Sequence, residues 1–596
     1  MNALFLVPFV GCMVAGPPQA GRQVEFNRDI RPILSDNCFT CHGPAKSTRK
    51  ADLRFDTEEG AKADLGDYFA IVPGKPGASM LIERITATEK GKVMPPPSSN
   101  KKLSPQQIEL LRQWIAEGAV WQQHWAFIAP KRPALPTVKN AAWPKNPIDH
   151  FVLARLEKEG LPPQPEASPE TLIRRVSLDL TGLPPTIAEI DAFLKDCASA
   201  QPQAKDDAYR KVVERLLASP RYGERMVLDW LDAARYSDTN GYQTDGTRAM
   251  WPWRDWVIDA LNKNMPFDQF TIEQIAGDLL ASPTIPQRIA TGFHRNHMLN
   301  GEGGRIAEES RVDYVVDRVD TTGTVWLGLT VGCGRCHEHK YDPLSQKEYY
   351  QLFAYWNNIA EVGGVDRRNG TAAPTIDLPT PEQKKRIDGE SQKVADLEKQ
   401  FKELNDELQA RQTAWERDEI KDNKLPAGIR QALSVATEKR DKAQLELIRD
   451  HYYKSVPERQ KLQTQIDQAK KSLAAAQNSV LITMIMEERK EPRETFVLRR
   501  GIYNKYGEKV QASVPRALPP LPKGAPNSRL GFAQWLVAKE NPLTARVTVN
   551  RMWQMFFGTG LVKTTEDFGI QGDPPSHPEL LDWLAVEFME PTPSRG

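Results

Sequence analysis

One five-residue pattern of cysteine and histidine occurs twice in this chain, at residues 38–42 (CFTCH) and at residues 333–337 (CGRCH). The frequencies of Cys and His in the 596 residues predict roughly 0.001 chance copies. C-x-x-C-H is the pattern of covalent haem c attachment, because two thiols add to the haem vinyl groups while the adjacent imidazole faces the iron. We therefore expect one haem c at each motif. The residues of the two expected sites are Cys38, Cys41, His42, Cys333, Cys336 and His337.

Two other chemistries also use paired cysteines. Zinc ribbons place their two pairs about 15–20 residues apart, whereas almost half of this chain separates the two pairs. A redox motif of the thioredoxin type needs a βαβ context, which the sequence predicts around neither pair. Zinc binding would also leave the adjacent histidine unexplained at both motifs, so haem attachment is favoured. Cys12 and Cys197 lie outside the motifs and have no assigned role.

Met94 is expected to be the second iron ligand at the first motif. It lies in a Val-Met-Pro-Pro segment between the motif and a helical pattern at 105–116. This order along the chain places Met94 on the far face of the haem. A methionine opposite a histidine raises the potential of the iron. Two alternatives stay open, namely Met94 as a core side chain and His124 as the ligand.

The second motif has weaker candidates for a distal ligand. His339 follows His337 too closely to reach the opposite haem face, which leaves His294 and His297. Each of these is also typical of a hydrogen-bonded structural histidine. If neither binds, the iron is open to a small molecule. Upstream acidic residues are expected to serve acid–base chemistry, to bind a cation, or only to form a solvated helix face: Glu302, Glu308, Glu309 and Asp313.

Residues 1–20 are expected to be a signal peptide, because an apolar run is followed by small residues and prolines, although the usual positive start is missing. A buried N-terminal strand is the alternative, and Cys12 could mark a lipoprotein site. We expect a periplasmic or secreted protein. The net charge of +1 argues against a nucleic-acid partner. No apolar run reaches the ~20 residues that span a bilayer.

Three helical patterns can be placed closely. Ser104 is expected to cap a helix with Pro105 at its first position, and a helix is expected at 251–262. In 308–320 the valines at 312, 315, 316 and 319 form an apolar stripe, and the acidic residues at 309, 313, 317 and 320 form a second stripe.

The sequence predicts a mainly α fold. A helical, cytochrome c-like domain is expected at 24–121, followed by a Pro-rich linker at 122–147 and a larger helical domain at 148–360. Residues 381–476 show apolar positions three and four apart and predict an antiparallel coiled-coil hairpin, which turns at 421–428 and is expected to dock a partner. A β-containing segment and a partial helical domain are expected at 484–596. The expected coiled-coil seam consists of Val394, Leu397, Phe401, Leu404, Leu408, Leu462, Ile466, Ala469, Leu473 and Ala476.

Residues 26–44, FNRDIRPILSDNCFTCHGP, resemble the planctomycete-type cytochrome c domain. Residues 148–357 resemble the domain of unknown function that usually follows it, most closely at WRDWVIDA (253–260) and CGRCHEHKYDP (333–343). Residues from about 484 resemble a second domain of unknown function, with NPLTARVTVNRMW at 541–553. The resemblance implies haem attachment at the first motif, Met94 as its distal ligand, and export. The family's last domain continues past Phe588, so a truncated or frame-shifted gene product is expected.

These observations favour an exported, dihaem c-type cytochrome that carries electrons between a redox partner protein, or a small-molecule donor or acceptor, and its own haems. An oxidoreductase that acts on a substrate such as a carbohydrate at the second haem is the first alternative. A scaffold that binds a glycan or a partner is the second. The three differ in the number of haems and in whether the second iron is open.

Overall fold

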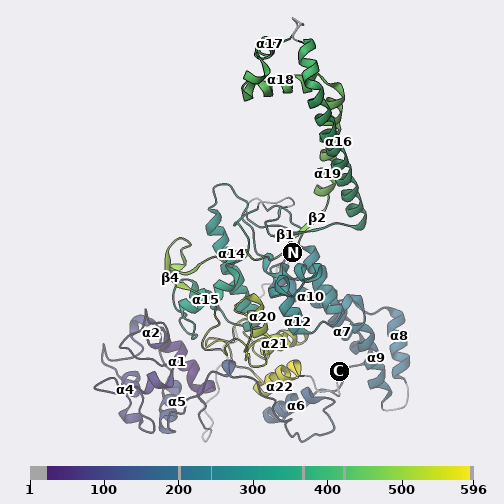
Figure 1. The fold of residues 1–596 in the computed structure, drawn as a ribbon. Coiled ribbons are helices and arrows are strands. Elements are labelled where there is room, and N and C mark those ends of the chain that lie inside the picture. The colour runs from purple at the N-terminus through teal and green to yellow at the C-terminus, as the bar shows by residue number, and fades with distance from the viewer. Residues whose placement is uncertain (1–22, 199–202, 243–244, 366–369, 420–424, 591–596) are drawn as a thin grey trace, which may run out of the picture. The chain divides into compact units, whose positions relative to one another are not determined.

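Figure 1 shows a computed structural model of the chain, which describes residues 23–198, 203–242, 245–365, 370–419 and 425–590. The chain is 56% helical, with 22 α-helices in the described ranges, and 4% is strand in two small antiparallel sheets. The predicted mainly α fold class is confirmed. No helix in these ranges is long and apolar enough to cross a membrane. The expected signal peptide at 1–20, Cys12 and the tail at 591–596 lie outside the described residues.

The N-terminal region forms its own apolar cluster, in which Phe26, Leu34 and Trp114 are buried. The predicted helix start at Ser104 is present, since its side chain accepts from the Gln107 N–H and Gln107 bonds back to the Ser104 N–H. The start of the predicted linker, just beyond residue 121, still contacts this region, since the Arg31 guanidinium donates to the Gln122 carbonyl. The helices here are α1 Arg31–Asn37, α2 Phe39–His42, α3 Glu58–Lys62, α4 Met80–Thr86 and α5 Pro105–Ala116.

The larger helical region begins at α6. Its helices are α6 Pro147–Glu159, α7 Pro169–Thr181, α8 Ile187–Cys197, α9 Ala204–Leu217, α10 Pro220–Ala233, α11 Trp251–Asn262, α12 Phe267–Ala276, α13 Ile285–Ala290, α14 Ala307–Thr322 and α15 Gln346–Trp356. In α14 the four valines that the sequence places on one stripe are all buried, at positions 312, 315, 316 and 319. Helices α7 to α9 enclose a separate small apolar cluster around Ile173 and Phe193.

The C-terminal region shares the main core with the larger helical region. Val547, Phe568 and Trp583 belong to the same apolar cluster as Trp253 and Trp326. The predicted β-like segments form the antiparallel pair β3 Thr495–Leu498 and β4 Tyr506–Val510. The expected final helical stretch consists of three helices joined by loops, α20 Arg529–Leu536, α21 Thr544–Phe557 and α22 Pro578–Met589.

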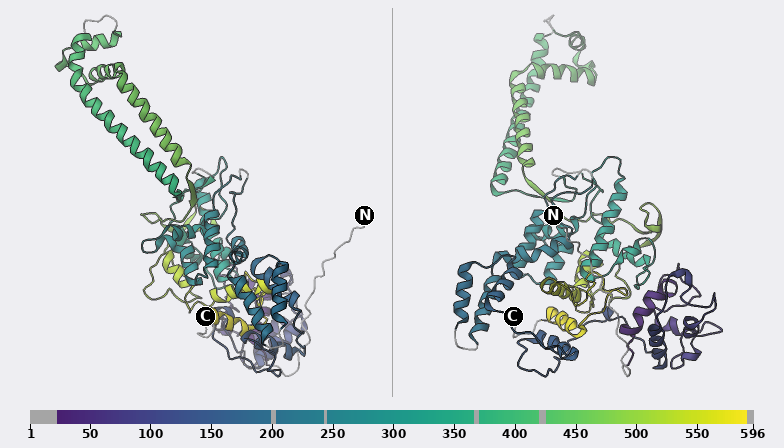
Figure 2. Two further views of the ribbon diagram at one scale, coloured as in Figure 1. Left: turned by 90° about the vertical axis from the view of Figure 1, so that its right-hand side faces the viewer. Right: turned by 180° about the vertical axis from the view of Figure 1, so that it is seen from behind.

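Residues 375–483 form a separate compact unit. Two long helices, α16 Pro381–Glu419 and α19 Pro457–Asn478, run side by side (Figure 2). Val394, Leu408 and Ile466 of the expected seam are buried, and the other seam residues are at least partly buried. Instead of a simple turn, the tip carries α17 Ala427–Leu433 and α18 Lys442–Ser455, which close a small apolar cluster. Strands β1 Thr375–Leu378 and β2 Leu481–Met484 pair at its base.

Excision of residues 375–483 with a short Gly-Ser bridge is expected to leave haem content and absorption spectra unchanged. The Ile485 N–H donates to the Pro374 carbonyl at 3.2 Å, so a short bridge can join the two ends without moving the rest of the chain. Haem stain and spectra of the shortened and full-length proteins, expressed with cytochrome c maturation, provide the check. A shortened protein that folds but carries less haem would contradict this expectation.

Candidate functional site

The first motif lies in a helical turn that follows α1. The N–H groups of Cys41 and His42 donate to the Cys38 carbonyl at 3.1 and 2.8 Å, which presents both thiols and the imidazole from a single turn. All three side chains are partly buried. Burial raises the pKa of the Cys38 thiol to about 12. Redox-active CxxC pairs have a lowered thiol pKa instead, so this environment argues against the disulfide alternative.

The orientation of His42 fits an iron ligand. Its Nδ1 lies 3.1 Å from the Lys50 carbonyl oxygen, which can only accept, so Nδ1 carries the proton and the Nε2 lone pair is left for a metal. Phe55 meets the ring edge-on at 5.8 Å between centroids. Gly43 follows at a point where a Cβ would lie 2.4 Å from the Phe39 carbonyl oxygen, so the turn accepts only glycine without rearrangement.

The two candidates for a distal ligand at the first motif differ in their surroundings. Met94 is partly buried, and its N–H donates to the Arg84 carbonyl at 2.9 Å, which ties its loop to α4. His124 is buried. Burial and the nearby Arg31 and Arg546 lower the pKa of His124 to about 3, so it is neutral at physiological pH.

The second motif repeats the same turn on the surface. The N–H groups of Cys336 and His337 both donate to the Cys333 carbonyl at 3.3 Å. His337 Nδ1 lies 2.6 Å from the Glu338 carbonyl oxygen, which again leaves Nε2 for a metal. Both thiols and the imidazole are exposed here, unlike those of the first motif. The glycine at 334 packs against Tyr349, where a Cβ would lie 2.8 Å from the Tyr349 Cβ.

The fold brings together the segments that follow the two motifs. The Lys46 N–H, four residues after His42, donates to Glu338 Oε2 at 2.6 Å, and Glu338 directly follows His337. Tyr341, shortly after the second motif, packs against the apolar cluster of the N-terminal region. Almost three hundred residues separate these partners in the sequence, so no local pattern could have predicted their contact.

His294 and His297, the candidate distal ligands of the second motif, are both buried. His297 Nε2 accepts from Arg318 Nη2 at 2.8 Å, and its Nδ1 donates to the Met298 carbonyl at 2.9 Å, so neither ring nitrogen is left for iron. His294 is fully buried, and Trp356 lies 4.2 Å from its ring centroid. The structure therefore does not present either histidine to the exposed His337.

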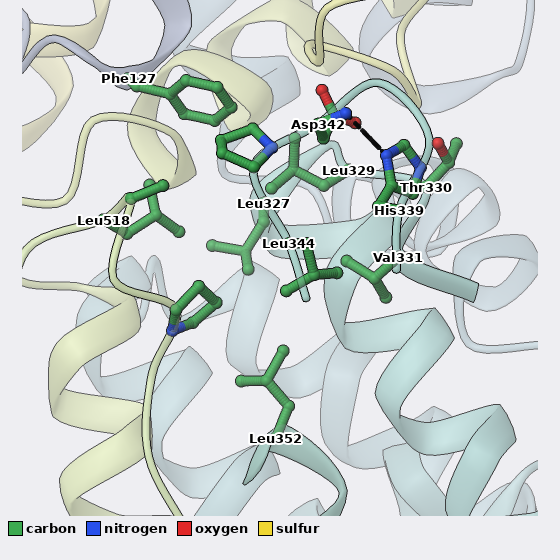
Figure 3. A pocket seen from close by; sticks show the side chains of 13 residues that line it. Phe127, Leu327, Leu329, Thr330, Val331, His339, Asp342, Leu344, Leu352 and Leu518 are labelled. Atoms are coloured by element: carbon green, nitrogen blue, oxygen red, sulfur yellow. Dashed lines mark hydrogen bonds and ion pairs between the residues drawn. The ribbon is translucent and has the colours of Figure 1, made fainter. Parts of the chain in front are cut away.

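His339 is buried, and its Nδ1 accepts from the Asp342 N–H at 2.7 Å. Figure 3 shows His339 and Asp342 at one end of a pocket whose walls are mainly apolar. The cavity volume is ≈ 20 Å³, which is room for about one water molecule. This pocket is too small for a substrate.

The acidic segment upstream does not form one cluster. Glu308 pairs with Arg311, and Asp313 pairs with Arg335 of the second motif at 2.7 Å. Glu309 is exposed, as expected for a solvated helix face. A further acidic group, Asp320, lies beside the start of the motif and accepts from the Tyr349 hydroxyl at 3.1 Å. A Cβ on Gly332 would lie 3.2 Å from its Oδ2. The sequence placed Asp320 on the same acidic stripe but gave no sign that it is packed under the motif.

Burial raises the pKa of Asp320 to about 6, so the folded state binds this proton more tightly than the unfolded chain does. Its contribution to stability is complete below the ordinary Asp pKa and is lost as the pH rises through 6. Asp320→Asn is therefore expected to raise the free energy of unfolding at pH 8, by at most about 3 kcal/mol. The gain should vanish near pH 4 in urea titrations, whereas Glu309→Gln should show no such trend. A gain that does not vary with pH would contradict this assignment.

Within the described residues, no three His, Cys, Asp or Glu side chains are grouped as one metal ion would need them. Covalent haem c requires no such group, since only the histidine of C-x-x-C-H meets the metal. Each motif supplies two free thiols and one imidazole with Nε2 free, which is the donor set that haem c needs.

Comparison with protein families gives three matches. Residues 38–98 match a family described as Planctomycete cytochrome C, residues 147–361 match Protein of unknown function (DUF1549), and residues 528–594 match Protein of unknown function (DUF1553). The resemblance inferred from the sequence is thereby confirmed. The first match covers Cys38, Cys41, His42 and Met94 and indicates a haem-binding, cytochrome-like protein. No curated protein and no solved structure matches the chain.

Proposed function

We propose that this cytochrome-like chain is an exported electron carrier that holds haem c at both motifs. The observation that carries the proposal is the repeated local geometry, in which one helical turn presents two thiols and a histidine whose Nδ1 bonds to a backbone carbonyl. Bound haem c supplies a reversible one-electron couple at its iron. The residues proposed to hold it are Cys38, Cys41 and His42 at the first motif, and Cys333, Cys336 and His337 at the second.

The contact between the segments that follow the two motifs supports a shared role in electron transfer. Glu338 bonds to the loop that follows His42, and Glu338 is also among the charges that raise the pKa of Arg54, close to Phe55. Electrons are therefore proposed to pass between the two sites within one chain and to leave through a redox partner protein or a small molecule.

At the first site we propose Met94 as the distal ligand, with His124 as the alternative. Met94→His is expected to lower the reduction potential of this site, because His/Met ligation raises the potential relative to two histidines. A spectroelectrochemical titration of the protein and the variant measures this directly. His124→Leu should leave the potential unchanged. If Met94→Ala leaves both spectrum and potential as they were, another residue is the ligand.

At the second site we propose an iron with an open or weakly held sixth position. His297 has no free ring nitrogen, His339 follows His337 too closely to reach the opposite haem face, and His294 is enclosed in the core, while the motif itself is exposed. The exposure favours the oxidoreductase alternative as the second candidate function.

Carbon monoxide is expected to bind the reduced protein at one haem per chain, and no binding would show that a side chain fills the sixth position. Reaction of the protein with peroxide would favour an enzyme over a simple electron carrier.

A further inference from the structure

A pocket of ≈ 290 Å³ lies between α14, α15 and the β3–β4 hairpin, which adjoin one another in Figure 1. Its volume is close to the lower limit of small-ligand sites. Aromatic side chains form much of its wall, including Phe353, Phe496, Tyr503 and Tyr506. The rings of Phe496 and Tyr506 lie 5.1 Å apart, and Tyr506 is 55% exposed. This wall can hold the flat, apolar part of a small molecule.

Two acidic and two basic side chains line the pocket, and Arg493 is the one of the four that forms no ion pair among the described residues. Arg311 forms a two-point ion pair with Glu308 at 2.7 and 2.8 Å, and Glu494 pairs with Lys509 outside the pocket. The Arg493 guanidinium donates only to backbone carbonyls, those of Asn357, Ile359 and Glu361.

The surroundings of Arg493 would favour a bound anion. Burial, then Arg311 and Arg489, lower the pKa of Arg493 to about 10, although Glu361 and Glu308 act in the opposite direction. An arginine in such a place offers a planar fork that matches a carboxylate and that a lysine cannot reproduce. One negative charge would neutralise it, and the aromatic wall beside it would cover an apolar body.

The pocket adjoins the second motif through three contacts. Asp313, one position after the pocket residue Val312, pairs with Arg335 inside the motif. Gln346 Nε2 donates to the Arg335 carbonyl at 3.1 Å and to that of the pocket residue Leu498 at 3.4 Å. The hairpin turn approaches so closely that a Cβ on Gly501 would lie 3.1 Å from Cys336 Sγ.

We propose that this pocket binds a small organic monocarboxylate with a flat, apolar or aromatic body, held by Arg493 and stacked on Tyr506 and Phe496. The binding itself does not depend on haem. Only its use, to bring a reactant or effector next to the second motif, rests on the proposed function.

Calorimetric titration of the full-length holoprotein with benzoate tests the binding, with benzyl alcohol as the neutral probe of similar shape. Benzoate is expected to bind at least tenfold more tightly than benzyl alcohol. Arg493→Lys and Tyr506→Ala are each expected to weaken benzoate binding at least tenfold. Phe557→Ala, which removes an exposed aromatic ring outside the pocket, should have no effect.

Three results would overturn the proposal: no benzoate binding at tens of millimolar, equal binding of benzyl alcohol, or unchanged binding by the folded Tyr506→Ala variant. Arg493 also bonds to three carbonyls, so Tyr506→Ala keeps the test valid if Arg493→Lys does not fold. Repeating the titration on Cys333→Ala/Cys336→Ala separates the two proposals. Retained binding there, with no change of the haem spectrum on adding benzoate to the holoprotein, would leave the pocket in place but remove its link to the second motif.

Discussion

Replacing both Cys38 and Cys41 by alanine is expected to remove all covalent haem from the first motif and to leave one haem per chain. Thioether attachment needs these two thiols, and both lie on the turn that presents His42. Haem stain of the denatured protein and the intact mass measure the loss. The fold should remain, because both cysteines are only partly buried and Cys38 packs against the apolar cluster around Phe26 and Trp114 without belonging to its buried core.

Cys197→Ala is the matched control, since this cysteine lies in α8, outside both motifs. It should keep the full haem stain. A Cys38→Ala/Cys41→Ala protein that also keeps the full stain would show that the first motif does not attach haem. A haem stain reduced to half would show independently that the second motif also carries a haem.

Glu361→Ala is expected to destabilise the protein by about 3–5 kcal/mol, because it removes the carboxylate that two buried guanidinium groups share. Glu361 pairs with Arg295 at 2.9 Å and with Arg318 at 2.5 Å, and both arginine side chains are fully buried. Although burial alone would raise it, Arg318 and Arg295 hold the pKa of Glu361 below its usual value. Arg318 also bonds to His297, so the segment that carries both distal candidates should loosen as well.

Urea denaturation measures this loss, and Glu508→Ala provides the comparison. Glu508 pairs with Lys347 on the surface, where both side chains are about half exposed, so its removal should cost less than about 1 kcal/mol. Similar small losses for both variants would contradict a structural role of the buried charges.

Where local physical chemistry decides the structure, the sequence predicted it well. The helix at 251–262 has the expected bounds, Ser104 caps its helix, and the valine stripe of α14 faces the core. The two long helices of the separate unit follow the expected apolar spacing. This spacing can be read locally, because apolar residues three or four positions apart lie on the same face of a helix. The two tip helices were missed because their apolar cluster joins Trp415 to α17 and α18, which are distant in sequence.

The surroundings of the motifs depend on distant contacts and could not be predicted. His294 and His297 look alike in the sequence. Only the structure shows that Arg318 donates to the ring of His297 and that aromatic rings enclose His294. The bond from Lys46 to Glu338 joins segments from two different regions of the chain. The pocket around Arg493 forms only when the hairpin packs on α14 and α15.

The number of covalently bound haems per chain is the most direct test of the proposed two-haem electron carrier. The full-length protein, expressed with cytochrome c maturation, is analysed by pyridine haemochrome absorbance per mole of chain and by intact mass after denaturation. Two covalently bound haems per chain are expected, falling to one in Cys333→Ala/Cys336→Ala. One haem in the unmodified protein would remove the second site and the joint role of the motifs, and no haem would contradict the electron-carrier function altogether.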